Sequence, residues 1–166
     1  QRQMCIRDSR DRIDAMIEAW DPDHIWFSPT CKLWGRWVKI NCAKPGDFKD
    51  RLQGLRKKEM AQLKWMIKTY RWQCRRGKDA SVEQPAASEM KSLKIFDFLK
   101  SPRPKLCHSY RAVLDQCTVG LKCPETGGPV RKRTWVVTSS PKMADRLNRR
   151  CKCEKPHIRL EGSFRV

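Results

Sequence analysis

The chain has 166 residues, of which 39% are hydrophobic and seven are tryptophan, enough for the core of one domain and too many for disorder throughout. Lysine and arginine outnumber aspartate and glutamate by 37 to 18, which gives a formal net charge of +19. This imbalance favours a polyanionic partner, and we expect nucleic acid, DNA in particular. The alternative is a fragment whose acidic complement lies elsewhere. Because no apolar run approaches the roughly 20 residues of a membrane span, we expect a soluble protein without a membrane partner.

The cysteines give a second constraint, on the cellular compartment. There are nine, an odd number, and no two of them form a C-x-x-C pair. No secretory signal peptide precedes them. This usage favours reduced thiols over a disulfide framework, and we expect an intracellular, nuclear location.

The two ends of the chain differ from its middle in pattern. Residues 1–9, QRQMCIRDS, show no periodicity and resemble the translation of a sequencing adapter, so we interpret them as a non-native leader. Residues 10–162 carry the elements of one α/β domain fragment, and residues 163–166 form a tail. No internal repeat is visible.

Extended and helical segments alternate along this domain. The large apolar run His24–Phe27 is halted by Pro29, which is typical of a buried strand. We expect strands over residues 24–27, 79–83, 110–114 and 134–138, helices over residues 11–20, 47–76, 94–100 and 141–150, and a loop between Cys31 and Gly46. The alternation predicts the α/β class, with a partial Rossmann-like, largely parallel sheet and flanking helices.

Residues 47–76 have the strongest helical pattern. One face is apolar and carries Phe48, Leu52, Leu55, Leu63, Met66, Tyr70 and Cys74, and Gly77 is placed to cap the helix end. Between Gly46 and Lys78 there are eleven basic and only three acidic residues. This sign of charge favours phosphate contacts over the alternative, a merely solvated face. The residues expected to make such contacts are Arg56, Lys57, Lys64, Lys68, Arg71, Arg75 and Arg76.

Three polar features adjoin successive predicted strands: Cys31 after Ser-Pro-Thr, Glu83 before Gln-Pro, and the pair Arg131 and Arg133 at a strand entry. In a doubly wound sheet, such strand ends converge on one crevice. The features resemble the catalytic half of C5-cytosine DNA methyltransferases, with their Pro-Cys loop, Glu-Asn turn and Gln-x-Arg-x-Arg strand entry. The stretches SPTCKLW, VEQPAASEM, DQCTVGL and LNRRC further resemble methyltransferase-like segments of retroelement polyproteins.

The resemblance implies roles for five residues. Cys31 supplies a thiolate that adds to C6 of a flipped-out cytosine, and Glu83 hydrogen-bonds the ring N3. Arg131 and Arg133 position the base and its phosphate. The implied cofactor is S-adenosylmethionine, with Pro29 beside it. The basic surroundings favour the thiolate form of the cysteine.

The sequence also departs from that signature. Thr30, Gln84 and Pro129 stand where the family has proline, asparagine and glutamine, and no glycine-rich strand–turn–helix for the cofactor is present. We therefore expect a methyltransferase-like fragment that is incomplete or inactive alone. The alternatives are a non-catalytic basic module that binds nucleic acid within a retroelement polyprotein, and a degenerate reading frame that folds poorly.

A second candidate site lies near the end of the chain, where Cys151, Cys153 and His157 follow a C-x-C-x₃-H pattern. Zinc takes four thiolate or imidazole ligands in a tetrahedron. The fourth ligand is expected from Cys117, Cys123, Cys107 or His108, between which the sequence does not decide. The alternative is a solvated basic tail whose thiols are incidental.

Overall fold

The computed structural model describes residues 2–43, 46–99, 109–154 and 156–158. The α-helices are α1 (Arg2–Trp20), α2 (Arg36–Cys42), α3 (Phe48–Arg75) and α4 (Pro141–Leu147). The strands are β1 (His24–Phe27), β2 (Asp79–Pro85), β3 (Tyr110–Asp115) and β4 (Arg133–Thr138). Three short 3₁₀ helices are η1 (Glu89–Ser92), η2 (Lys94–Leu99) and η3 (Gln116–Val119). The predicted α/β class is confirmed.

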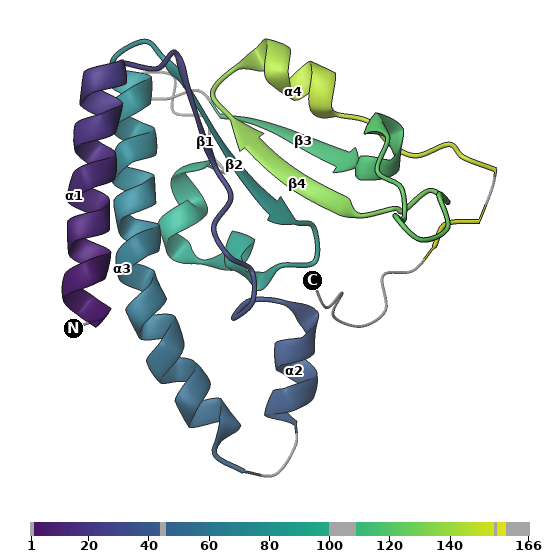
Figure 1. Cartoon of the computed structure of the whole chain (residues 1–166), viewed down its shortest axis with the longest axis horizontal. Helices are drawn as coiled ribbons and strands as arrows, with labels where there is room; N and C mark the ends of the chain where they lie inside the picture. The colour runs from purple at the N-terminus through teal and green to yellow at the C-terminus, as the bar shows by residue number, and fades with distance from the viewer. Residues whose placement is uncertain (1, 44–45, 100–108, 155, 159–166) are drawn as a thin grey trace.

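The four strands form one open mixed sheet in the order β1-β2-β4-β3 (Figure 1). β1 and β2 pair in parallel, whereas β4 pairs antiparallel with both β2 and β3. Three strands thus run in one direction and β4 alone runs against them. The expectation of largely parallel pairing is wrong for β3 and β4, because residues 116–132 join them without the helical crossover that parallel neighbours require.

The long helix α3 is the crossover of the parallel β1–β2 unit, and α1 lies alongside it in Figure 1. The main core lies between α3 and one face of the sheet. Its buried members are Trp34, Leu63, Met66, Ile67, Tyr70, Ala80, Val82, Met90, Phe96 and Val137. The predicted apolar face of α3 is correct at Leu52, Leu63, Met66 and Tyr70. Leu55, however, is 50% exposed, because the first half of α3 extends past the sheet beside α2.

The end of α3 is closed as predicted at Gly77. This residue has a φ of +73°, a backbone conformation that glycine adopts at little cost. Its N–H donates to the carbonyl of Cys74, and the N–H of Lys78 donates to the carbonyl of Gln73. These two bonds form a Schellman motif, which turns the chain directly into β2.

The helices differ from the sequence expectation in four ways. α1 begins at Arg2 rather than residue 11, so residues 2–9 are helical, and α4 ends at Leu147. Part of the expected loop before residue 46 is α2, and the helix expected over residues 94–100 is the 3₁₀ helix η2. α2 and η2 have only seven and six residues, in which apolar periodicity is weak, so packing against α3 decides them.

Candidate metal centre and nucleic-acid interface

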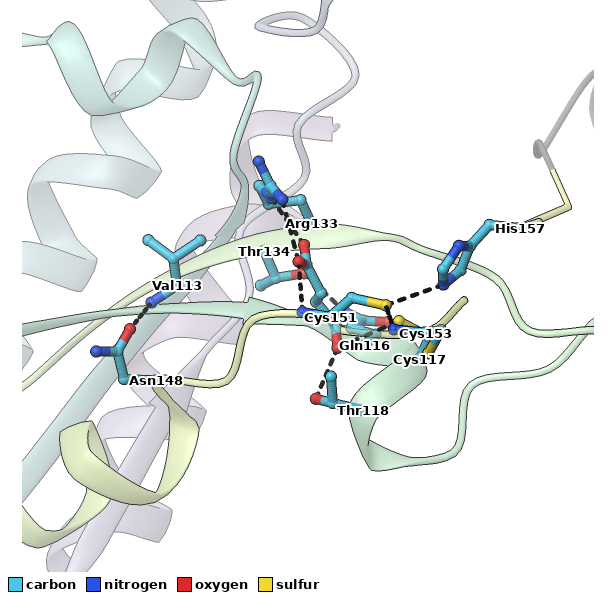
Figure 2. A network of polar contacts seen from close by, with 11 residues as sticks. Val113, Gln116, Cys117, Thr118, Arg133, Thr134, Asn148, Cys151, Cys153 and His157 are labelled. Carbon is cyan, nitrogen blue, oxygen red and sulfur yellow. Dashed lines mark hydrogen bonds and ion pairs between the residues drawn. The ribbon is translucent and has the colours of Figure 1, made fainter. Parts of the chain in front are cut away.

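Three sulfurs and one imidazole meet beyond the end of β3. They belong to Cys117, Cys151, Cys153 and His157, and their ligand atoms all lie within 4.8 Å of one another. Two of them, Cys151 Sγ and His157 Nε2, lie 3.2 Å apart (Figure 2). Cys153 is exposed and the other three are half-buried. The cluster could hold a metal ion.

Cys117 is fixed by the turn that ends β3. Asp115 precedes the 3₁₀ helix η3, and its carbonyl accepts hydrogen bonds from the Thr118 hydroxyl at 2.8 Å and from the Cys117 thiol at 3.8 Å. Gln116 donates through its side-chain amide to Thr134 Oγ1 on β4 at 2.8 Å. The cysteine is therefore held by contacts to both strands of the β3–β4 pair.

Cys151 is held by the segment that follows α4 along the outer edge of β3. Asn148 Oδ1 accepts from the Val113 N–H at 3.3 Å, and the Arg149 carbonyl accepts from the Asp115 N–H at 2.9 Å. The Cys151 N–H then donates to Asp115 Oδ2 at 3.0 Å. These bonds satisfy backbone groups on the edge strand and place the Cys151 sulfur beside the turn of Cys117.

Asp115 is the polar anchor beneath the cluster. Its side chain is only 1% exposed, and besides Cys151 it bonds to Arg133 through Nε and Nη2, at 2.7 and 3.1 Å. These contacts, of which the Arg133 hydrogen bond is the largest, lower the pKa of Asp115 to about 2. A buried carboxylate paired in this way stays ionised at neutral pH and orients the metal-ligating segment.

His157 is positioned by its neighbour Ile158. The Ile158 N–H donates to the Pro129 carbonyl at 3.0 Å, and Ile158 forms a parallel bridge with Val130. The Ile158 side chain lies over Gly128, so closely that a Cβ added there would be 2.5 Å from Ile158 Cδ1. The absence of a side chain at Gly128 therefore allows the approach that brings His157 to the sulfurs.

The three thiols have unequal pKa values. Burial, followed by hydrogen bonding and negative charge from Cys151, raises the pKa of Cys117 to about 11. The side chain and the backbone N–H of Cys153 lower the pKa of Cys151, and the N–H lies 3.2 Å from its sulfur. The same contact with Cys151 raises the pKa of Cys153. The negative charges of neighbouring thiolates therefore oppose deprotonation of all three cysteines, unless a cation binds between them.

The donor set fits a closed, tetrahedral metal site. Three cysteines and one histidine are a ligand set of structural zinc sites, in which Zn–S bonds near 2.3 Å place the sulfurs about 3.8 Å apart. The four ligand atoms all lie within 4.8 Å of one another, so they need to move only slightly closer to reach that geometry. Because all four positions are filled by protein, such a site has no place for a substrate and is structural.

The sequence identified three of these four ligands. Cys117, one of four candidates for the fourth position, is the one that the structure places in the cluster. Cys123 is buried in its own turn, where its N–H donates to the Gly128 carbonyl at 2.8 Å. Cys107 and His108 lie outside the described residues. No spacing rule singles out Cys117, because it reaches the cluster only through the packing of the post-α4 segment on β3.

Three of the residues predicted for cytosine chemistry, Pro29, Cys31 and Glu83, lie at the ends of β1 and β2, on the other side of the strand order from β3. Ser28 Oγ donates to Glu83 Oε2 at 3.0 Å, and Gln84 Nε2 donates to the Pro29 carbonyl at 2.6 Å. The Pro-Cys-like loop and the glutamate turn are thereby tied together. Cys31 is half-buried, and its carbonyl accepts from the Trp34 N–H at 2.9 Å. Glu83 Oε1 is buried and has no partner among the described residues.

The two predicted arginines differ in their surroundings. Arg133 begins β4 and forms an ion pair with Asp115. Asp115 also binds the Cys151 N–H, so Arg133 lies beside the candidate metal centre. Arg131 is exposed two residues earlier, in the segment that leads into the strand. Because β4 runs antiparallel to β2, both arginines lie at the same end of the sheet as Glu83.

Four of the seven predicted phosphate-binding residues line one hollow. Lys64, Lys68, Arg71 and Arg75 come from α3, and Lys94 of η2, for which the sequence carried no site prediction, also lines it. All five are exposed. Their spacing of three or four residues along α3 puts the four helix cations on one side of the helix.

The other three predicted residues lie outside this hollow. Arg56 stacks on Trp34, with 4.3 Å to the ring centroid, and pairs with Glu89 at 2.9 Å. Arg76 stacks on Trp72 at 4.3 Å and pairs with Asp21. Lys57 is exposed on α3. The two arginines therefore have structural contacts within the protein.

Fold and sites together define an α/β protein with a candidate metal centre and a basic hollow. No protein-family model matches this chain, and neither a curated protein nor a solved structure does. Across residues 2–43, 46–99, 109–154 and 156–158, no helix is both long and apolar enough to span a bilayer.

Proposed function

We propose that this protein is a nucleic-acid-binding domain whose C-terminal segment is fastened by a structural zinc ion. The observation that carries the proposal is the hollow formed by five exposed cations from α3 and η2. A hollow lined by positive charges raises the local electrostatic potential and attracts polyanions. The net charge of the whole chain, +19, adds long-range attraction. The ligand we propose is nucleic acid, DNA in the first instance.

Zinc is the metal that we propose for the four-ligand cluster. Thiolates and imidazole suit zinc among the abundant divalent ions, whereas magnesium and calcium prefer oxygen ligands. Cys117, Cys151, Cys153 and His157 would hold it, and the ion would supply the positive charge that lets three sulfurs lie together as thiolates. It would join the end of β3 to the segment after α4.

Metal content tests this part of the proposal. We expect native mass spectrometry of protein purified with zinc to give one zinc ion per chain, and its removal by a chelator to lower the unfolding temperature. A Cys117→Ser variant should lose the ion, whereas Cys42→Ser, a half-buried cysteine on α2, should keep it. Full zinc content in the Cys117 variant would refute the assignment.

Competition between polyanions tests nucleic-acid binding. A labelled oligonucleotide bound to the protein is challenged with unlabelled oligonucleotide or with polyglutamate at equal charge concentration. We expect the oligonucleotide to displace the label far more effectively, because phosphate spacing and sugar contacts add to simple charge attraction. Equal displacement by the two competitors would reduce the interaction to non-specific charge and contradict the proposal.

A second candidate function is covalent addition of Cys31 to cytosine within a partial Rossmann-like, methyltransferase-like sheet. Two hydrogen bonds that join the Ser28–Pro29 loop to Glu83 and Gln84 favour it, at 3.0 and 2.6 Å. In doubly wound folds, the reversed strand of an otherwise parallel sheet commonly lies at the edge, whereas β4 lies between β2 and β3. The sequence has no glycine-rich turn to fit S-adenosylmethionine, so methyl transfer is not assigned to this chain.

Trapping on modified DNA tests the second candidate. A 2-pyrimidinone base lacks the 4-amino group, which makes its C6 more electrophilic, so a positioned thiolate should form an adduct that survives denaturation. We expect the adduct with the unaltered chain and with Cys42→Ser, and none with Cys31→Ser, whose DNA affinity should be nearly unchanged. Absence of an adduct from the unaltered chain would exclude this chemistry and leave nucleic-acid binding intact.

A further inference from the structure

The hollow beside α3 has two basic walls and an apolar floor. The helix wall carries Lys64, Lys68, Arg71 and Arg75, the opposite wall carries Lys94, and Ile67 and Ile95 lie between them. Its cavity volume is about 360 Å³, and no carboxylate is among the residues that line it. The hollow is therefore a basic site to which two elements, α3 and η2, contribute cations.

The second wall is held firmly in the fold. Phe96 of η2 is 1% exposed and Met90 of η1 is fully buried, in the same core as Leu63 and Tyr70 of α3. The hydroxyl of Ser88 accepts the Met90 N–H at 3.2 Å and thereby starts η1. Because Phe96 follows Lys94 and Ile95 in η2 and is buried in the core, this part of the hollow is held in place without a ligand.

The charges of the two walls repel one another. No salt bridge from the described residues neutralises Lys64, Lys68, Arg75 or Lys94. A bound anion would turn this repulsion into attraction, and the hollow would raise the local potential further because its walls are of low dielectric constant. A single small anion could contact only part of the row, whereas a chain of phosphates would contact all of it.

The length of the row matches a nucleic-acid backbone. Lys64 and Arg75 are eleven residues apart on α3, which corresponds to about 16 Å along the helix axis. A strand carries one phosphate for each roughly 3.4 Å of duplex axis, so the row reaches several successive phosphates. Because the cations come from both α3 and η2, a single backbone bound between these elements would contact both sets, and we expect a wider duplex to contact fewer of them.

We propose that this hollow holds the sugar–phosphate backbone of a single nucleic-acid strand, with Lys94 closing over it from η2. The inference rests on the proposed nucleic-acid binding and specifies its ligand. The floor of Ile67 and Ile95 would contact the sugars. None of the residues that line the hollow is aromatic, so bases gain no stacking platform there and binding should depend little on base sequence.

Two oligonucleotides and two matched variants test the inference. The probes are fluorescein-labelled oligo(dT) of about 12 nucleotides, longer than the hollow, and a mixed-sequence duplex of equal length. Binding is measured by fluorescence anisotropy. The test variant combines Lys68→Gln with Lys94→Gln, one from each wall. The control combines Lys58→Gln with Lys142→Gln, two exposed lysines outside the hollow.

We expect the unaltered chain to bind oligo(dT) more tightly than the duplex. The test variant should lose at least about tenfold in oligo(dT) affinity, and its salt slope should shrink by about 1.4, because two phosphate contacts are gone. The control variant should change affinity by less than about threefold, since it lacks only distant charges. Failure of the unaltered chain to bind either probe would refute the proposed function itself. Tighter binding of the duplex, or equal losses in both variants, would refute only the assignment of one strand to this hollow.

Discussion

Asp115 and Arg133 face each other across the β3–β4 pair, joined by hydrogen bonds of 2.7 and 3.1 Å. The same carboxylate accepts the Cys151 N–H at 3.0 Å. One buried acid therefore connects the last pair of strands with the segment after α4, which carries three of the four candidate metal ligands. Arg133, expected from the sequence to position a base, pairs with this acid beside the candidate metal centre.

Replacing this acid should weaken the β3–β4 end of the fold. We expect Asp115→Asn to lower the free energy of unfolding by about 1–2 kcal/mol at pH 7, since charge-assisted bonds are lost on a pair whose arginine is half exposed. Urea unfolding of the metal-free protein, prepared with a chelator, measures this loss. Asp145→Asn, on the exposed face of α4, is the charge-matched control and should change little.

The same ion pair predicts that stability depends on pH in the acid range. The pKa of Asp115 is about 2 in the folded protein against an ordinary 3.8, so its contribution is complete above pH 3.8 and is lost as the pH falls toward 2. The stability difference between the unaltered chain and Asp115→Asn should therefore shrink across that range in metal-free protein. A difference that stayed constant down to pH 2 would contradict the assigned ion pair.

Gly128, which is not one of the candidate ligands, offers a second test of the metal centre. A methyl group at this position would overlap Ile158 Cδ1, and we expect Gly128→Ala to displace His157 and weaken zinc binding by roughly 10- to 100-fold. Competition with a zinc indicator measures the affinity. Adding Ile158→Ala to this variant removes the overlap and should recover part of the affinity. A Gly128→Ala variant with unaltered affinity would mean that His157 is placed by other contacts.

Glu59, on α3, predicts a dependence of stability on pH. Burial raises its pKa above the ordinary 4.5, although the Trp34 indole and Arg56 partly offset that effect. The folded state then binds the proton more tightly, so acidification from pH 7 to below 4.5 should stabilise the unaltered chain relative to Glu59→Gln. Thermal unfolding at several pH values measures the difference. A relative change in the opposite direction would mean that the carboxylate is favoured in its charged form.

Much of the fold could be predicted from local pattern. Prolines next to short apolar runs mark the ends of β1 and β2, and the apolar stripe of α3 with Gly77 behind it gives both the helix and its end. The reversal of β4 could not be predicted in this way. It follows from the turns between β3 and β4, where Gly120 and Gly127 have φ values of +92° and +67° and return the chain beside itself.

The sites follow the same division between local and long-range information. Cys151, Cys153 and His157 share a short stretch and could be grouped by spacing. Cys117 joins them only because edge bonds along β3 bring distant segments together. Lys94 was missed for a similar reason, since its short helix shows no charge pattern and gains its role only by facing α3.

The salt dependence of oligonucleotide binding tests the central claim most directly. If the five cations of the hollow contact a single strand, the logarithm of the association constant should fall with the logarithm of salt concentration at a slope of about −3.5. Affinity for oligo(dT) should then drop roughly 100-fold between about 50 and 200 mM salt in the zinc-loaded protein. An affinity that stayed flat over that range would contradict the account.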